Sequence, residues 1–61
     1  MEKADFIKRL VALRVSKGAS ARDMSLSLGQ SAGYINNIEN GVNHPSMTVF
    51  FYICDYLGIS P

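Results

Sequence analysis

The stretch Tyr34-Ile35-Asn36-Asn37-Ile38-Glu39-Asn40-Gly41, followed after a short gap by Pro45-Ser46, decides the fold of this chain. Ile35 and Ile38 are three residues apart, which places both on one side of a helix. The Asn side chains around them then project from the opposite side. Gly41 suits the left-handed end of that helix, and Ser46 suits the cap of the next. The stretch therefore predicts a helix with an apolar inner side and an amide-rich outer side, then a turn and another helix.

The same kind of break recurs along the rest of the chain. A Gly and a following Ser stand in Gly18-Ala19-Ser20, in Leu28-Gly29-Gln30-Ser31, between Gly41 and Ser46, and in Gly58-Ile59-Ser60. These breaks predict a first helix over about residues 3–17 and three further helices that open at Ser20, Ser31 and Ser46. Ser20 and Asp23 also have the spacing of a capping box, with Asp in place of Glu.

Apolar residues recur at helical spacing within each predicted helix. The expected inward residues are Phe6, Leu10 and Leu13 in the first helix, Met24 and Leu28 with the small Ser25 in the second, Ile35 and Ile38 in the third, and Met47, Phe50, Ile53, Cys54 and Leu57 in the fourth. A second apolar stripe in the first helix contains Ile7, Val11 and Val15. Because no segment alternates as a half-buried strand does, the predicted fold class is all-α, a compact four-helix bundle.

Length and composition limit the function classes. The 61 residues, 48% of them hydrophobic and 18% charged, allow one packed domain over 1–61 and no cleft between two lobes. The formal charge is +1, and all six basic residues fall within the first 22. We find no apolar run of membrane length, no signal peptide pattern and no paired cysteines, so we expect a cytoplasmic protein that does not bind membranes.

Several short motifs together resemble a known family. They are Leu13-Arg14, Ser20, Leu28-Gly29, Ser31, the stretch from Tyr34 to Gly41, Pro45-Ser46, and Leu57-Gly58-Ile59-Ser60. Their order and spacing resemble the lambda-repressor-like, Cro-type (Xre) helix-turn-helix domain, and the similarity runs from about Phe6 to the end. Two short helices over about 20–40, joined by a tight turn that contains Gly29, are the helix-turn-helix itself.

The resemblance implies a bundle of four helices, five in relatives, that binds double-stranded operator DNA in a bacterium or phage as a transcriptional regulator. It further implies that the protein binds a two-fold DNA site as a homodimer and that it is found at the bacterial nucleoid. The recognition helix, about 31–40, enters the major groove, with Ala32, Gly33, Asn36 and Asn37 facing the bases. The side-chain amide of an Asn can form hydrogen bonds with N6 and N7 of one adenine at the same time, whereas Ala32 and Gly33 have too little side chain to distinguish bases directly. Any one of these Asn residues taken alone also fits an ordinary solvated helix face.

Contacts to the DNA backbone are expected on both flanks of the recognition helix. The candidate residues are Ser20, Arg22, Ser31, Tyr34, Asn40, Asn43 and His44. Relatives often carry Gln where this chain has Ala21, and Lys or Arg in the loop that here reads Val42-Asn43-His44. The resemblance also implies that Arg14 and Glu39 form a structural ion pair that joins the first helix to the recognition helix.

Catalytic and metal chemistry have little support in the sequence. Cys54 lies on the apolar stripe of the fourth helix with no acid-base partner nearby, which favours a core thiol over a nucleophile. We find no Cys/His cluster, nucleophile elbow or glycine-rich phosphate loop. We therefore expect no enzyme activity, no cofactor, no metal and no small-molecule substrate.

The fourth helix has more apolar side chains than one buried side requires. Val49, Tyr52 and Tyr56 recur opposite the predicted core side and form the candidate dimer surface. Relatives continue into a fifth helix near Ser60-Pro61 that covers part of this region. An alternative function is therefore a helix-turn-helix fold that acts as a protein-interaction or dimerisation module, with weak or no DNA binding.

Overall fold

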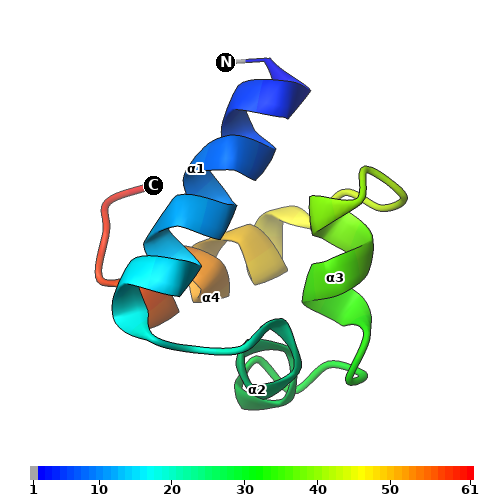
Figure 1. Ribbon diagram of the computed structural model, residues 1–61, viewed down its shortest axis with the longest axis vertical. Helices are drawn as coiled ribbons and strands as arrows, with labels where there is room; N and C mark the ends of the chain where they lie inside the picture. The colour runs from blue at the N-terminus through cyan, green and yellow to red at the C-terminus, as the bar shows by residue number, and fades with distance from the viewer. Residues whose placement is uncertain (1) are drawn as a thin grey trace.

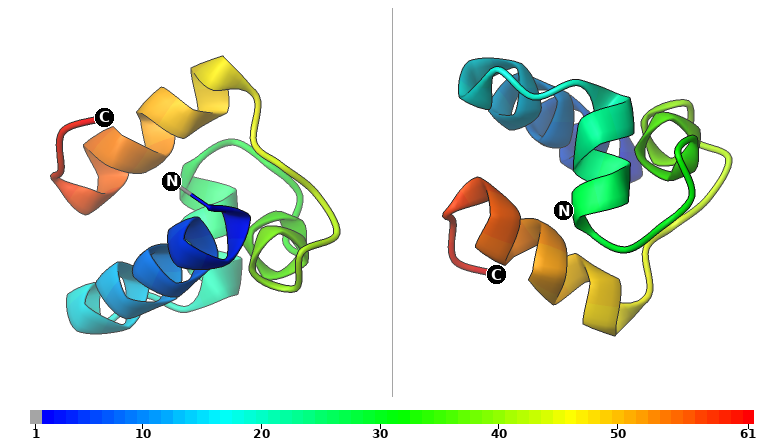
Figure 2. Two further views of the ribbon diagram at one scale, coloured as in Figure 1. Left: turned by 90° about the horizontal axis from the view of Figure 1, so that it is seen from above. Right: turned by 90° about the horizontal axis from the view of Figure 1, so that it is seen from below.

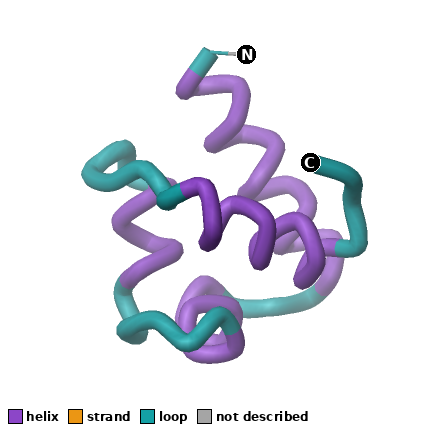
Figure 3. Tube along the Cα trace, turned by 180° about the vertical axis from the view of Figure 1, so that it is seen from behind, coloured by secondary structure: helices purple, strands orange, loops and turns teal. Residues whose placement is uncertain are grey.

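The computed structural model describes residues 2–61, and over these residues it contains four α-helices and no strand. The helices are α1 (Lys3–Lys17), α2 (Ala21–Ser27), α3 (Tyr34–Glu39) and α4 (Met47–Leu57). In Figure 1, α1 lies on one side and α3 on the other, with α2 below them. Seen from behind, α4 crosses in front of α1 (Figure 3). The predicted all-α class and the four-helix bundle are confirmed.

Every helix contributes to one hydrophobic core. Five side chains form its centre and are at most 2% exposed: Leu10 from α1, Met24 from α2, Ile35 and Ile38 from α3, and Ile53 from α4. Viewed from above and below, the helices surround the space that these side chains fill (Figure 2). Cys54 is buried beside this cluster. The inward side of α3 was thus predicted correctly, and its outward side is left for other contacts.

Two of the three predicted serine caps are present. Ser20 begins α2, where its hydroxyl accepts a hydrogen bond from the Asp23 amide at 3.0 Å. Ser46 begins α4 in the same way, accepting from the Val49 amide at 3.2 Å. Each hydroxyl satisfies a first-turn amide that has no acceptor within its own helix.

The predicted start of the third helix at Ser31 is wrong. The helix begins at Tyr34 after a turn in which the Ser31 carbonyl accepts from the Tyr34 amide at 3.1 Å. Gly33, with φ of −93°, occupies the cap position and has no side chain to cap with. Gly is a poor residue for the interior of a helix, so the regular helix starts after it.

The predicted sides of the fourth helix also need correction. Met47 was expected in the core, yet its side chain is 70% exposed because it lies in the first turn of α4, beyond the reach of the core. Val49 and Tyr56 were expected on an exposed surface, yet both are partly buried and pack against the core. Tyr52 is 52% exposed, as expected. The exposed apolar surface of α4 is therefore Met47, Phe51 and Tyr52, which we call the α4 patch.

Candidate nucleic-acid interface

The outward side of α3 presents two adjacent amides. Asn36 and Asn37 are both exposed, while Ile35 and Ile38 on the same short helix are 0% and 1% exposed. The Asn37 amide donates to the Gly33 carbonyl at 3.0 Å, so the backbone that carries both side chains is helical. Both amide side chains are therefore open to solvent on the side of α3 that faces away from the core.

The other two predicted base-facing residues lie in a different local structure. Ala32 and Gly33 belong to the turn before α3 and not to the helix itself. Ala32 is partly buried and Gly33 is exposed. Small side chains at this turn leave the backbone accessible, because a Cβ added at Gly33 would meet nothing within 4 Å.

The predicted backbone-contacting residues lie before and after α3. Exposed polar side chains are Ser20 and Arg22 at the start of α2, Ser31 in the turn before α3, and Asn40, Asn43 and His44 after it. The Ser20 oxygen already accepts from the Asp23 amide, so its hydroxyl hydrogen is the part left to donate outward.

Tyr34 differs from the other candidates because it is partly buried and packs against the core. That burial disfavours the charged phenolate, which raises the pKa of Tyr34 above its ordinary value of 10.0. At neutral pH the hydroxyl is protonated and retains a hydrogen to donate.

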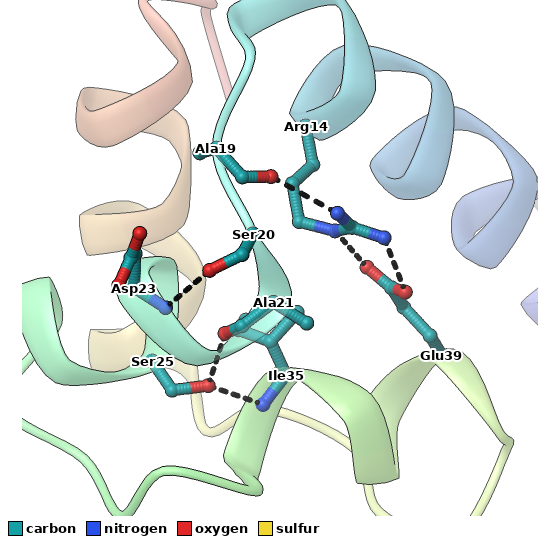
Figure 4. A network of polar contacts seen from close by, with 8 residues as sticks. All are labelled: Arg14, Ala19, Ser20, Ala21, Asp23, Ser25, Ile35 and Glu39. Carbon is teal, nitrogen blue, oxygen red and sulfur yellow. Dashed lines mark hydrogen bonds and ion pairs between the residues drawn. The ribbon is translucent and has the colours of Figure 1, made fainter.

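The predicted ion pair between Arg14 and Glu39 is confirmed. Arg14 Nε lies 2.7 Å from Glu39 Oε2, and its Nη2 lies 3.0 Å from Oε1, so the contact is bidentate (Figure 4). Its Nη1 donates to the Ala19 carbonyl at 3.0 Å. The hydrogen bond to Glu39 is the main cause of a raised Arg14 pKa, partly opposed by desolvation. The pair fixes the end of α3 to α1 and to the chain entering α2.

Comparison with protein families shows to which helix-turn-helix family the chain belongs. The model of the Cro/C1-type (Xre) helix-turn-helix family matches residues 10–61. The chain belongs to this family. The matched part contains α2, α3 and α4 entirely, and a Cro/C1-type helix-turn-helix is a DNA-binding domain that typically has no catalytic activity. Searches against curated proteins and against solved structures gave no match.

One cation beside the interface of this Cro/C1-type domain was missed by the sequence analysis. Lys3, in the first turn of α1, donates from Nζ to the Gly41 carbonyl at 2.9 Å, across 38 residues of sequence. Its charge therefore lies at the loop that follows α3, and Lys3 and His44 line the same shallow hollow. No local pattern could reveal this contact, because it depends on where the start of α1 lies relative to the end of α3.

A second missed residue is Ser25, which lies on the inward side of α2. Its hydroxyl donates to the Ala21 carbonyl at 2.7 Å and accepts from the Ile35 amide at 2.9 Å (Figure 4). The sequence signal was present, since Ser25 is a polar residue between Met24 and Leu28 on an apolar side. Spacing within one helix indicates that this hydroxyl is buried, but it does not indicate which amide the oxygen accepts from.

Three further observations concern metal sites, membrane spans and grooves. Among residues 2–61, no group of three or more His, Cys, Asp or Glu side chains is placed to hold a metal ion. In the same part of the chain, every helix is too short or too polar to span a bilayer. The groove between α1 and α4, about 200 Å³ in volume, is lined mainly by apolar side chains and lies away from α3.

Proposed function

We propose that this chain is a sequence-specific transcriptional regulator of a bacterium or phage, which inserts α3 into the major groove of operator DNA. The observation that carries the proposal is the exposed pair Asn36 and Asn37, opposite the buried Ile35 and Ile38. An Asn side chain can accept a hydrogen bond from adenine N6 while it donates one to N7, a bidentate pair that distinguishes adenine from the other bases. The small size of Ala32 and Gly33 allows the protein backbone to approach the DNA closely. Such a regulator would act at the chromosome, in the cytoplasm.

Backbone contacts would hold α3 in register from both of its ends. Ser31 and the Tyr34 hydroxyl serve the end where α3 begins, and Ser20 and Arg22 add contacts from the start of α2. Asn40, Asn43, His44 and the newly located Lys3 serve the end where α3 finishes. These contacts add affinity for any duplex, whereas Asn36 and Asn37 select among sequences.

The exposed α4 patch favours a homodimer within this proposal. Met47 and Phe51 lie one turn apart on α4 and are 70% and 45% exposed, and Tyr52 on the same helix is 52% exposed. Exposed large apolar side chains are typical of association surfaces. A two-fold dimer would present two copies of α3 to two half-sites of the operator. If DNA binding were absent, the same patch would support the alternative function of a dimerisation module.

Selection from a pool of random duplexes tests the function, because it does not require that the operator sequence be chosen in advance. We expect the folded protein to enrich a common motif, with adenine at the positions read by α3. Asn36→Ala combined with Asn37→Ala should abolish the preference for that motif over a scrambled duplex. Asn43→Ala is the matched control, because it should weaken binding to both duplexes by a similar factor.

Two results would contradict the proposal. If the folded wild type enriches no motif, the chain is not a sequence-specific regulator. If the double Asn variant still discriminates the selected duplex from the scrambled one, the reading residues are elsewhere.

A further inference from the structure

The start of α3 lacks a cap from its own segment of chain. Gly33 occupies the cap position and has no side chain, and Ser31, three residues before the helix, gives only its backbone carbonyl to Tyr34. The cap of an α-helix normally accepts from the amide of the second or third helical residue. With Tyr34 as the first residue of α3, the second is Ile35.

Ser25 supplies the acceptor that this segment lacks. Its Oγ lies 2.9 Å from the Ile35 nitrogen, in the position of the missing cap oxygen, although it comes from α2 (Figure 4). The side chain is 0% exposed, so water does not compete for either partner. In a water-excluded site, a hydrogen bond is stronger and its loss leaves an unsatisfied amide.

The second bond of Ser25 fixes the direction of the first. The hydroxyl hydrogen points to the Ala21 carbonyl, 2.7 Å away, one turn earlier in α2. With the hydrogen committed there, a lone pair of the same oxygen is directed at Ile35. The rotation of the Ser25 side chain, the axis of α2 and the first turn of α3 are therefore set together.

We propose that Ser25 is a positioning residue that caps the recognition helix from the preceding helix and thereby fixes the angle at which α3 presents Asn36 and Asn37. Ile35 is the immediate neighbour of Asn36, so a displacement of the Ile35 backbone also displaces the side chains of Asn36 and Asn37. Ser25 itself, being buried, does not touch DNA. The part of this inference that concerns DNA reading rests on the proposed function, whereas the capping itself does not.

Ser25→Ala tests the inference, because it removes both hydrogen bonds and leaves the small size of the residue almost unchanged. Ser27→Ala, an exposed position on the same helix, is the matched control. Far-UV circular dichroism and urea unfolding first establish conditions under which all three proteins are folded. Amide hydrogen exchange by NMR then compares Ile35 with Leu10 of α1, whose exchange reports any global loss of stability.

In Ser25→Ala we expect the exchange of Ile35 to accelerate about tenfold more than that of Leu10, since a buried amide loses its acceptor. We also expect the ratio of affinities for the selected and scrambled duplexes to fall about tenfold, with binding to the scrambled duplex unchanged. Ser27→Ala should change neither quantity. A residue that only stabilised the fold would lower binding to both duplexes in proportion to the folded fraction, and would leave the ratio unaltered.

Four other outcomes are informative in different ways. Equal acceleration at Ile35 and Leu10 would overturn the capping role. Selective acceleration at Ile35 with an unchanged affinity ratio would overturn the positioning role in DNA reading. If wild type shows no preference for any duplex, the proposed function fails, and the exchange at Ile35 still decides whether Ser25 caps α3. Should Ser25→Ala not fold, Ile35 exchange in wild type decides: a rate as fast as that of an exposed amide would overturn the cap.

Discussion

The guanidinium of Arg14 and the carboxylate of Glu39 meet through two bonds of 2.7 and 3.0 Å, with side chains only 15% and 10% exposed. A charge that has left water in this way depends on its partner. Glu39→Ala should therefore lower the free energy of unfolding by about 3 kcal/mol, because it leaves Arg14 without its carboxylate.

Urea unfolding monitored by circular dichroism measures this loss. Glu39→Gln is the control, because an amide keeps part of the hydrogen bonding and should cost less than Glu39→Ala. An unfolding midpoint in Glu39→Ala equal to that of wild type would contradict the structural role of the pair.

Tyr34 gives the molecule a dependence on alkaline pH. Its folded pKa lies above the unfolded value, so the native state keeps a proton over a pH range in which the unfolded chain has lost it. The stabilisation from the protonated hydroxyl is fully present below about pH 10 and is lost as pH rises further. Wild type should lose more unfolding free energy than Tyr34→Phe between about pH 9 and pH 11. Parallel pH profiles for the two proteins would show that Tyr34 carries no such linkage.

Residue types predicted most of the core but only part of the polar network. Ile35 and Ile38 were predicted to face inward because their three-residue spacing places two large apolar side chains on one side of a short helix. Lys3 and Ser25 find their partners 38 and 10 residues away. Those contacts depend on the angles between helices, which periodicity within one helix does not specify.

The helix-turn-helix depends on one conformation at Gly29. Its φ is +77°, in the left-handed region that side chains with a Cβ disfavour, and this lets the chain leave α2 and turn toward α3. A Cβ at Gly29 would meet nothing within 4 Å, so the backbone conformation alone decides the cost of a substitution.

Gly29→Ala should therefore cost about 1 kcal/mol of unfolding free energy. Gly33→Ala, at φ of −93° and equally free of neighbours, should cost clearly less. Thermal or urea unfolding of the two variants gives the comparison. An equal loss in both would mean that the turn at Gly29 does not control stability.

Helix boundaries were predictable where a Gly ends one helix and a Ser caps the next, as at Ser20 and Ser46. The same rule failed at Ser31, because the chain there forms a turn and Ser25 provides the acceptor from another element. A cap supplied by a separate helix leaves no signature in the local sequence. The boundary error thus reflects Gly33, whereas the role of Ser25 was missed because its partner lies on another helix.

The charges of the whole molecule lie mostly outside the proposed reading side. Arg14 is paired with Glu39, and Lys17 Nζ lies 5.0 Å from the centre of the Tyr56 ring. Lys3, by contrast, lies at the loop after α3. Few cations remain to neutralise phosphates. The logarithm of affinity should thus fall only gently with the logarithm of salt concentration, by about 0.9 for each phosphate contacted.

Lys3→Ala should reduce that slope by about one, whereas Lys8→Ala, also in α1, should leave it unchanged. Fluorescence anisotropy at a series of salt concentrations measures both. An identical slope in wild type and Lys3→Ala would remove Lys3 from the interface.

The exposed α4 patch leads us to predict that the protein forms a homodimer. Phe51→Ser replaces an exposed aromatic ring by a hydroxyl and should shift a homodimer to monomer without loss of folding, because Phe51 is not part of the core. Sedimentation equilibrium at micromolar concentration distinguishes the two species, with Val42→Ser, another exposed apolar position, as the control. A wild type that is monomeric throughout would exclude the dimer.

The burial of Cys54, the single cysteine of the chain, has a practical consequence. At 3% exposure its thiol is shielded from reagents in solution unless the packing around α4 opens locally. The rate at which a thiol-reactive dye labels the native protein therefore reports how often that opening occurs, with no engineered probe. Association through α4 would slow the labelling as protein concentration rises, and a duplex held by α3 alone would alter it much less.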